Sequence, residues 1–130
     1  MVGVYYTSKL AQHYFALPSV ADKNPGYKKA LILIGSIGGY LEIVACDYTA
    51  SKWAVRGLFR AIRSKMEDLS HRVNLIAPWI MDTPMSKDFA NLLRQKNIPV
   101  GDANKVTEAV LRCAADETIC GEFAIFREPG

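Results

Sequence analysis

The chain has 130 residues, half of them apolar, which is enough for the core of one modest domain. Its formal net charge is +3 and its lysines and arginines are scattered, which argues against a nucleic-acid-binding protein. Its three cysteines show neither a CxxC pair nor a histidine at ligand spacing, so neither a disulfide framework nor a metal site is expected.

Nothing in the sequence indicates a membrane protein or a secreted one. The first residues lack a charged n-region and a long apolar run, so no signal peptide is predicted. The longest apolar stretch, 30–34, is far too short to cross a bilayer. We therefore expect a soluble cytoplasmic protein.

The first predicted elements are a helix, a loop and a strand. A helix is expected over 2–17, where apolar side chains follow helical spacing at Tyr6, Leu10, Tyr14 and Leu17. Residues 18–28 contain Asn-Pro-Gly and are expected to form a loop. The continuous apolar run over 30–34 predicts a strand that is buried on both faces.

A long amphipathic helix is predicted over 48–68, with Asp47 as its N-cap. Its apolar positions follow the i, i+3, i+4, i+7 pattern, and they are Ala50, Trp53, Ala54, Gly57, Leu58, Ala61, Ile62 and Met66. We interpret its basic side, with Arg56, Arg60, Arg63 and Lys65, as a face in contact with solvent.

The second half of the chain continues this alternation. A strand is predicted over 72–77, a short helix over 86–95, a helix over 103–115 and a final strand over 122–126. Strands and helices that alternate in this way indicate an α/β fold with a doubly wound parallel sheet. Crossover rules place the 30–34 strand beside the 72–77 strand, with the last strand beyond it.

Three strands are few for such a sheet. The 30–34 strand would have no partner on one side, although natural sheets avoid exposed apolar edges. We therefore expect residues 1–130 to form one truncated Rossmann-like domain, the C-terminal half of a larger fold.

Three side chains are predicted to meet at the carboxyl ends of the strands. Ser36 follows the 30–34 strand, and Tyr48 and Lys52 begin the next helix. Ligands of open α/β sheets bind beyond these strand ends. A tyrosine hydroxyl has an ordinary pKa of about 10, and a lysine one helical turn away favours the phenolate. The group is therefore suited to proton transfer at a hydroxyl or carbonyl group.

The spacing of tyrosine and lysine is weak evidence by itself. The chain contains a second Tyr-x-x-x-Lys at Tyr5 and Lys9, which we interpret as a contact on a helix surface. The hypothesis that Tyr48 and Lys52 belong to an active site gains support from Ser36 upstream. The Asn-x-x-x-Pro pattern of Asn74 and Pro78 downstream supports it as well.

The chain resembles the C-terminal half of the short-chain dehydrogenase/reductase family. The segments that carry the resemblance are LILIGSIGGY, YTASKWAVRGLFRAIRSKM and VNLIAPWIMDTPM, and the similarity covers nearly all of the chain. The segments YLE and VLRCAADE are most similar to those of fungal members related to hydroxyprostaglandin dehydrogenases.

The resemblance implies a role for each matching residue. Tyr48 would donate or accept the proton, Ser36 would orient the substrate oxygen, and Lys52 would favour the phenolate and hold the nicotinamide ribose. Cofactor contacts would also come from the main chain near Ile80 and Met81 and from Thr83. The alternative for Thr83 is a helix cap.

The resemblance further implies an NAD- or NADP-dependent oxidoreductase that acts on an alcohol or ketone. The apolar side chains of the expected lid point to a hydrophobic substrate, and they are Met81, Met85, Phe89 and Leu92. The 2–17 and 48–68 helices would form a homodimer interface.

The sequence departs from the family pattern in three respects. It contains no glycine-rich nucleotide loop, and the asparagine that completes the family's proton relay would fall just before Met1. The interval from Ser36 to Tyr48 is one residue shorter than is usual in the family, and Trp79 stands where the family usually has glycine. NAD and NADP cannot be distinguished, because the residues that face the adenosine ribose belong to the other half. The alternative is an inactive remnant that acts at most as a dimerisation partner.

Overall fold

A computed structural model describes residues 1–18, 27–42 and 45–125. The helices are α1 (Val2–Phe15), α2 (Cys46–Asp68), α3 (Lys87–Gln95) and α4 (Ala103–Ala115), with a 3₁₀ turn, η2, at Ile37–Gly39. The strands are β1 (Ala30–Ile34), β2 (Arg72–Pro78) and β3 (Gly121–Ile125). Most of the loop predicted over 18–28 lies outside the described residues, as does Phe126 of the predicted last strand.

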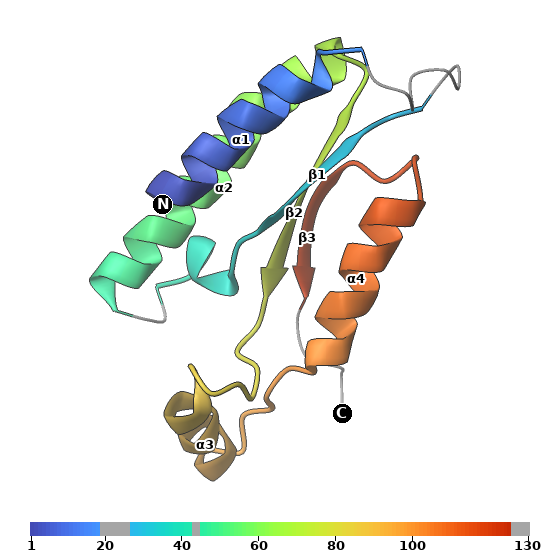
Figure 1. The fold of residues 1–130 in the computed structure, drawn as a ribbon. Helices are drawn as coiled ribbons and strands as arrows, with labels where there is room; N and C mark the ends of the chain where they lie inside the picture. Colours follow the sequence, from blue (N-terminus) through green and yellow to red (C-terminus); the bar gives the residue numbers. More distant parts are fainter. Residues whose placement is uncertain (19–26, 43–44, 126–130) are drawn as a thin grey trace.

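The strands form the parallel sheet that the alternation predicted. Their order is β1-β2-β3, with Ala30 opposite Arg72 and Asn74 opposite Gly121. Helices α1 and α2 lie side by side on one face, α4 covers the other face, and α3 lies beyond the carboxyl ends of the strands (Figure 1). The predicted α/β fold and strand order are confirmed. Within the described residues, no helix has both the length and the apolar character needed to cross a membrane.

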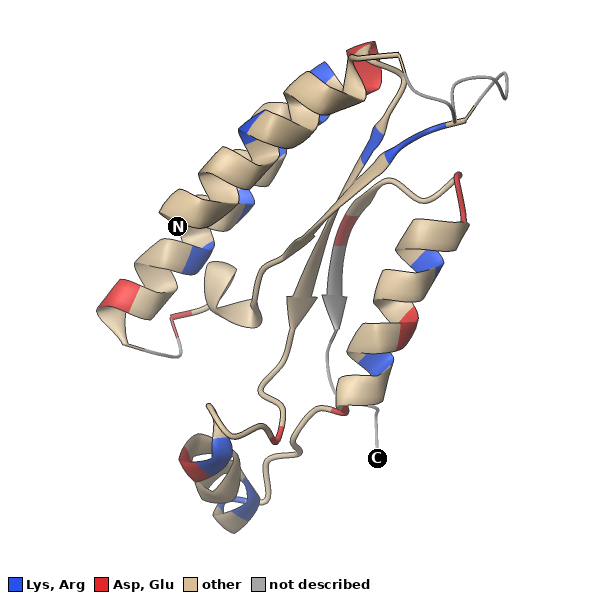
Figure 2. Ribbon diagram, in the orientation of Figure 1, with Lys and Arg blue, Asp and Glu red and all other residues tan. Residues whose placement is uncertain are grey.

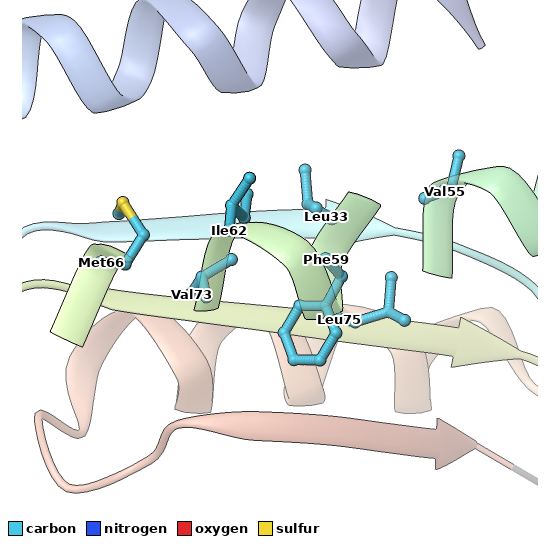
Figure 3. Packing of buried hydrophobic residues seen from close by; sticks show 7 residues of the cluster. All are labelled: Leu33, Val55, Phe59, Ile62, Met66, Val73 and Leu75. Atoms are coloured by element: carbon cyan, nitrogen blue, oxygen red, sulfur yellow. The ribbon is translucent and has the colours of Figure 1, made fainter. Parts of the chain in front are cut away.

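The main core lies between α2 and the sheet (Figure 3). Phe59 and Met66 are fully buried, and they pack with Val73 and Leu75 of β2. Positions 55, 59, 62 and 66 carry the buried residues of α2, so the spacing is helical. Alternate β2 residues point to the same face of the sheet, which brings Val73 and Leu75 together.

The predicted apolar stripe of α2 was only partly correct. Ile62 and Met66 belong to the core, whereas Trp53 is 46% exposed and Ala50 also faces solvent. The helix has apolar side chains on two sides, and the pattern combined them into one stripe. Its N-cap is Ala45 rather than Asp47, whose carboxylate instead accepts a hydrogen bond from the backbone N–H of Tyr48.

Helix α1 turns its aromatic stripe away from the sheet. Tyr6 and Tyr14 are each 61% exposed and Leu10 is 55% exposed, while the polar side chains of Ser8 and Gln12 are buried. The helix was predicted correctly, but its apolar stripe covers no part of the core. Helices α1 and α2 together therefore present an apolar outer surface.

Strand β1 is less buried than its apolar run predicted. Leu33 is buried, but Ile34 is 47% exposed and the other strand residues are only half-buried. The physical reason is the position of β1 at the edge of the sheet, where β2 is its partner among the described strands.

Two polar side chains of β2 hold α4 and β3 in place. The guanidinium of Arg72 donates hydrogen bonds to the carbonyl oxygens of Cys113, at 2.8 Å, and Ile119, at 3.0 Å. The amide oxygen of Asn74 accepts a hydrogen bond from the backbone N–H of Gly121, at 2.9 Å. Since carbonyl groups at a helix end lack partners within the helix, Arg72 caps α4 and Asn74 ties β3 to β2.

Candidate functional site

A cavity of about 350 Å³ lies where β1 and β2 end and where the segment leading to α3 begins. Its walls come from three parts of the chain, the β1–η2 connection, the start of α2 and the segment after β2. They are Ile34, Gly35, Ser36, Ile37, Tyr48, Pro78, Trp79, Ile80, Met81, Thr83, Met85, Ser86 and Phe89. Most of these side chains are apolar, so the few hydroxyl groups would orient a ligand.

Ser36 is placed by the end of β1 and by the turn that follows. The backbone N–H of Gly35 donates to the carbonyl oxygen of Ile76 at 2.7 Å, which extends the β1–β2 pairing up to the serine. Ser36 is extended, and its Oγ accepts a hydrogen bond from the N–H of Gly38 at 3.1 Å. This bond uses Oγ as an acceptor, so its proton is available for another oxygen.

Tyr48 lies in the first turn of α2, against the glycines of η2. A Cβ atom at Gly38 would lie 3.1 Å from Cε1 of Tyr48 and 3.6 Å from Oγ of Ser36. The absence of a side chain at this position lets the tyrosine ring approach the serine loop. The structure therefore brings the predicted Ser36 and Tyr48 to one cavity.

Lys52 lies one turn further along α2. Its Nζ is 5.5 Å from the ring centroid of Tyr48 and donates a hydrogen bond to the carbonyl oxygen of Gly35 at 3.2 Å. This bond holds the ammonium between the tyrosine and the end of β1. The lysine is thus positioned to interact with both the ring and any group that lies above Gly35.

The second Tyr-x-x-x-Lys pair has a similar local geometry. Nζ of Lys9 is 5.9 Å from the ring centroid of Tyr5, but both residues are exposed on α1 and neither lines the cavity. The spacing gives the contact in both helices, as helical geometry requires. What distinguishes Tyr48 is its place at the strand ends.

Of the predicted cofactor-contacting residues, Ile80, Met81 and Thr83 line the same cavity as Tyr48, whereas Lys52 does not. Ile80 and Met81 lie in an extended segment that the chain near Gly101 supports, since the N–H of Gly101 donates to the carbonyl oxygen of Ile80 at 2.7 Å. Thr83 bonds the hydroxyl of Ser86 at 2.7 Å, and Ser86 also donates to the carbonyl oxygen of Met81.

The structure also tests two other interpretations of this segment. Ser86 is the N-cap of α3, so Thr83 is not the helix cap that the sequence left open. Of the predicted lid residues, Met81, Met85 and Phe89 line the cavity, but Leu92 does not.

The close fit of η2 on α2 gives a test of the site's scaffold. A Cβ atom at Gly39 would lie 2.9 Å from the carbonyl oxygen of Lys52, which is closer than such atoms approach. We expect Gly39→Ala to lower the free energy of unfolding by about 1–3 kcal/mol, because either α2 or η2 must shift to make room for the new methyl group. Urea unfolding followed by circular dichroism measures the effect.

Gly57 is the matched control for this change. It lies within α2, and a Cβ atom there would meet nothing within 4 Å. Gly57→Ala should raise the free energy of unfolding by about 0.5–1 kcal/mol, because alanine is the better helix former. Equal effects at both positions would contradict the packing described for Gly39.

A cluster that no sequence pattern indicated lies beside the site and consists of Tyr40, Arg56, Arg60 and Glu122. Glu122 on β3 accepts hydrogen bonds from the hydroxyl of Tyr40 at 2.7 Å, from Nε of Arg56 at 3.1 Å and from Nε of Arg60 at 2.6 Å. The guanidinium of Arg56 also lies 3.9 Å from the ring centroid of Tyr40. Basic residues do line α2 (Figure 2), but Arg56 is half-buried, so the predicted solvent-exposed face was wrong at this position.

The cluster joins β3, α2 and the end of η2. Glu122 lies 82 residues from Tyr40 and 66 from Arg56, so no local spacing could have indicated their contact. Tyr40 immediately follows the glycines that pack on Tyr48 and Lys52, and the cluster therefore holds the serine loop against α2.

The charges of the cluster shift two pKa values. Partial burial raises the pKa of Glu122, but hydrogen bonds from Arg60, Tyr40 and Arg56 outweigh burial and lower it from 4.5 to about 2. Burial, followed by the hydrogen bond to Glu122 and its charge, raises the pKa of Tyr40 from 10.0 to about 12. The folded state thus favours a charged Glu122 and a neutral Tyr40.

The pKa of Glu122 predicts a loss of stability in acid. A carboxyl with a lower pKa in the folded state stabilises the fold above its unfolded pKa, so the contribution is present above pH 4.5 and falls toward pH 2. The quantity to compare is the free energy of unfolding of the wild type minus that of Glu122→Gln. This difference should be about 2 kcal/mol larger at pH 7 than at pH 2.5. Urea titrations at both pH values measure this difference, and a difference that is independent of pH would contradict it.

Comparisons with known proteins agree with this geometry. The family model described as short chain dehydrogenase matches residues 1–92. The 5'-hydroxyaverantin dehydrogenase of Dothistroma septosporum is 36% identical over the whole chain, which covers 44% of that protein. The NADP-dependent dehydrogenase clz5 of Cochliobolus lunatus is 33% identical over 93% of the chain and 46% of its own length.

A solved structure shows the same arrangement of elements. The 3-hydroxyacyl-CoA dehydrogenase type-2 from Mycobacterium avium superposes with a TM-score of 0.78 at 26% identity, over 95% of the chain and 50% of that protein. The chain thus spans about half the length of the proteins it matches. The expected likeness to fungal proteins is confirmed, while the likeness to hydroxyprostaglandin dehydrogenases stays a prediction.

Proposed function

Because the chain belongs to the short-chain dehydrogenase family, we propose that it carries the proton-transfer residues of an oxidoreductase site that interconverts an alcohol and a ketone. The observation that carries the proposal is the convergence of Ser36 and Tyr48 on one cavity, with Lys52 beside the tyrosine ring. The apolar walls of the cavity favour a hydrophobic substrate.

Each of the three side chains has a separate task in this proposal. The hydroxyl of Tyr48 gives a proton to the substrate oxygen during reduction and takes it back during oxidation. Ser36 donates its free proton to the same oxygen and orients it. The ammonium of Lys52 places a positive charge beside the tyrosine, 5.5 Å from its ring centroid.

The residues present fit the nicotinamide end of a dinucleotide. When bound, NAD or NADP supplies or accepts the hydride. Lys52 would hold the ribose from its position above Gly35, and the segment with Ile80, Met81 and Thr83 would contact the carboxamide and nearby phosphate.

The remainder of the dinucleotide has no comparable place among the described residues. Phosphate binding in such folds depends on a glycine-rich turn at a helix N-terminus, and the sequence contains no Gly-x-x-x-Gly-x-Gly pattern. We infer that residues 1–130 form one Rossmann-like domain that lacks the nucleotide-binding half. A relative named as NADP-dependent makes NADPH the first cofactor to test.

A titration of the purified chain with NADPH and NADH, followed by nicotinamide fluorescence, tests the proposal. Saturation at micromolar cofactor, followed by turnover of a hydrophobic ketone, supports an oxidoreductase. No binding up to millimolar cofactor would contradict activity of these 130 residues and favour the second function, a non-catalytic dimerisation partner.

The second function rests on the apolar outer surface of α1 and α2. Tyr6, Leu10 and Tyr14 of α1 are more than half exposed, and Trp53 of α2 is 46% exposed. Large apolar side chains that are exposed together on neighbouring helices are typical of a protein interface. We propose that a second copy of the chain, or a longer relative with the same helices, covers it.

Self-association is expected to depend on this surface. Leu10→Glu should shift a dimer to a monomer in sedimentation equilibrium at micromolar concentration, because a carboxylate would be buried in an apolar interface. Leu111→Glu is the control, because Leu111 is 63% exposed on α4, on the opposite side of the sheet. A wild-type monomer, or equal effects of both substitutions, would contradict the proposed interface.

A further inference from the structure

Trp79 joins the cavity wall to the base of the segment that carries α3. It directly follows Pro78, the buried end of β2, and it lines the cavity. Its Nε1 donates a hydrogen bond to the carbonyl oxygen of Pro99 at 3.0 Å. Trp79 therefore lies at the cavity and is bonded to the chain on the far side of α3.

The base of this segment is closed by further contacts. Met81 forms a parallel bridge with Gly101, and the N–H of Gly101 donates to the carbonyl oxygen of Ile80. A Cβ atom at Gly101 would lie 3.6 Å from the Cβ of Trp79, so the two chain segments pack directly together. Beyond this base, α3 stands away from the sheet (Figure 1).

The segment also has an internal link. Arg94 of α3 pairs with Asp82 at 2.6 Å, and Ala90 and Leu93 are buried. The segment between positions 79 and 101 is thus a connected unit that is attached to the sheet at its base. Trp79 lies at this attachment and next to the space a ligand would occupy.

We propose that Trp79 is a specificity-determining residue whose ring forms a fixed, flat wall of the cavity and favours ligands that carry an aromatic ring. The inference rests on the proposed function for the reacting group, an alcohol or ketone. The hydrogen bond from Nε1 to Pro99 satisfies the polar atom of the indole and restricts rotation of the ring. Its apolar surface is therefore available to a ligand without an unpaired N–H group.

Two further rings support an aromatic ligand. Tyr48 and Phe89 line the same cavity from α2 and α3, so three aromatic residues line it together with Trp79. Aromatic pairs gain affinity beyond that of the area they bury, by an amount that corresponds to about two- to tenfold. A cavity of about 350 Å³ has room for a two-ring compound.

The test compares methyl 2-naphthyl ketone with methyl decahydro-2-naphthyl ketone, which has the same skeleton without aromatic rings. Binding to the full chain is followed by NMR of the indole N–H groups of its two tryptophans. Trp53 lies outside the cavity and serves as an internal control, and Trp53→Phe assigns the two signals. No cofactor or turnover is needed, so the result is independent of the activity test.

The aromatic ketone should bind about two- to tenfold more tightly and should shift the Trp79 signal but not that of Trp53. Trp79→Leu should remove this preference, whereas Trp79→Phe, which keeps a ring but loses the bond to Pro99, should retain part of it. Equal affinity for the two ketones, no binding of either at millimolar concentration, or a preference that survives Trp79→Leu would overturn the proposal. If Trp79→Leu does not fold, the shift of the Trp79 indole signal in the wild-type chain decides whether the aromatic ketone binds beside this residue.

Discussion

Tyr48→Phe is expected to lower the turnover of a ketone by about 10²- to 10⁴-fold in an assay that detects oxidation of NADPH. The change removes only the hydroxyl group, and the ring can keep its contact with the turn at Gly38. Binding of the ketone and the free energy of unfolding should therefore change little. This combination distinguishes the loss of a proton donor from the loss of a folded site.

Tyr5→Phe provides a control within the same chain. Tyr5 has a lysine at the same spacing and at a similar distance from its ring, but it lies on α1 away from the cavity. Turnover by Tyr5→Phe should equal that of the wild type. A small effect of Tyr48→Phe, or similar losses for both variants, would contradict the role proposed for Tyr48.

Phe59→Ala is expected to lower the free energy of unfolding by about 3–5 kcal/mol. Phe59 is fully buried between α2 and the sheet, and it packs in the cluster that contains Leu33 and Leu75. Because a domain of this size is stable by only about 5–15 kcal/mol, this loss is a large fraction of its stability. Urea unfolding followed by circular dichroism gives the magnitude.

Leu111→Ala is the matched control for the core substitution. Leu111 is a large apolar residue in a helix, like Phe59, but it is 63% exposed. Its replacement should change the free energy of unfolding by less than about 0.5 kcal/mol. Similar losses at the two positions would mean that the core does not lie where Figure 3 places it.

The candidate site shows how well the spacing of residues in the sequence predicts which side chains meet in the structure. Ser36 and Tyr48 were predicted to meet because parallel strands end at one edge of a sheet, and the cavity contains both. The same local pattern at Tyr5 and Lys9 produced a surface contact instead. The position of a motif relative to the strand ends, rather than its residue pattern alone, decided which tyrosine lines the cavity.

The wrong predictions about the buried faces of α1 and α2 share a physical cause. The pattern of α2 included Trp53 in the buried stripe, and the stripe of α1 contained Tyr6 and Tyr14, yet all three side chains are exposed. Periodicity shows that a helix has an apolar side, but it does not show which neighbour covers that side. Helix α1 places another set of residues against the sheet, and α2 buries only part of its predicted stripe, including Ile62 and Met66.

The sequence by itself determined the order of helices and strands, the parallel sheet and the three residues proposed for proton transfer. These features depend on short-range patterns, since a helix, a strand or a catalytic spacing is encoded within a few residues. Only the tertiary structure decided that Glu122 binds Tyr40, Arg56 and Arg60, and that Trp79 reaches Pro99. Such contacts join residues far apart in the chain, and they arise only when the packed sheet brings β3 beneath α2 and closes the segment around α3.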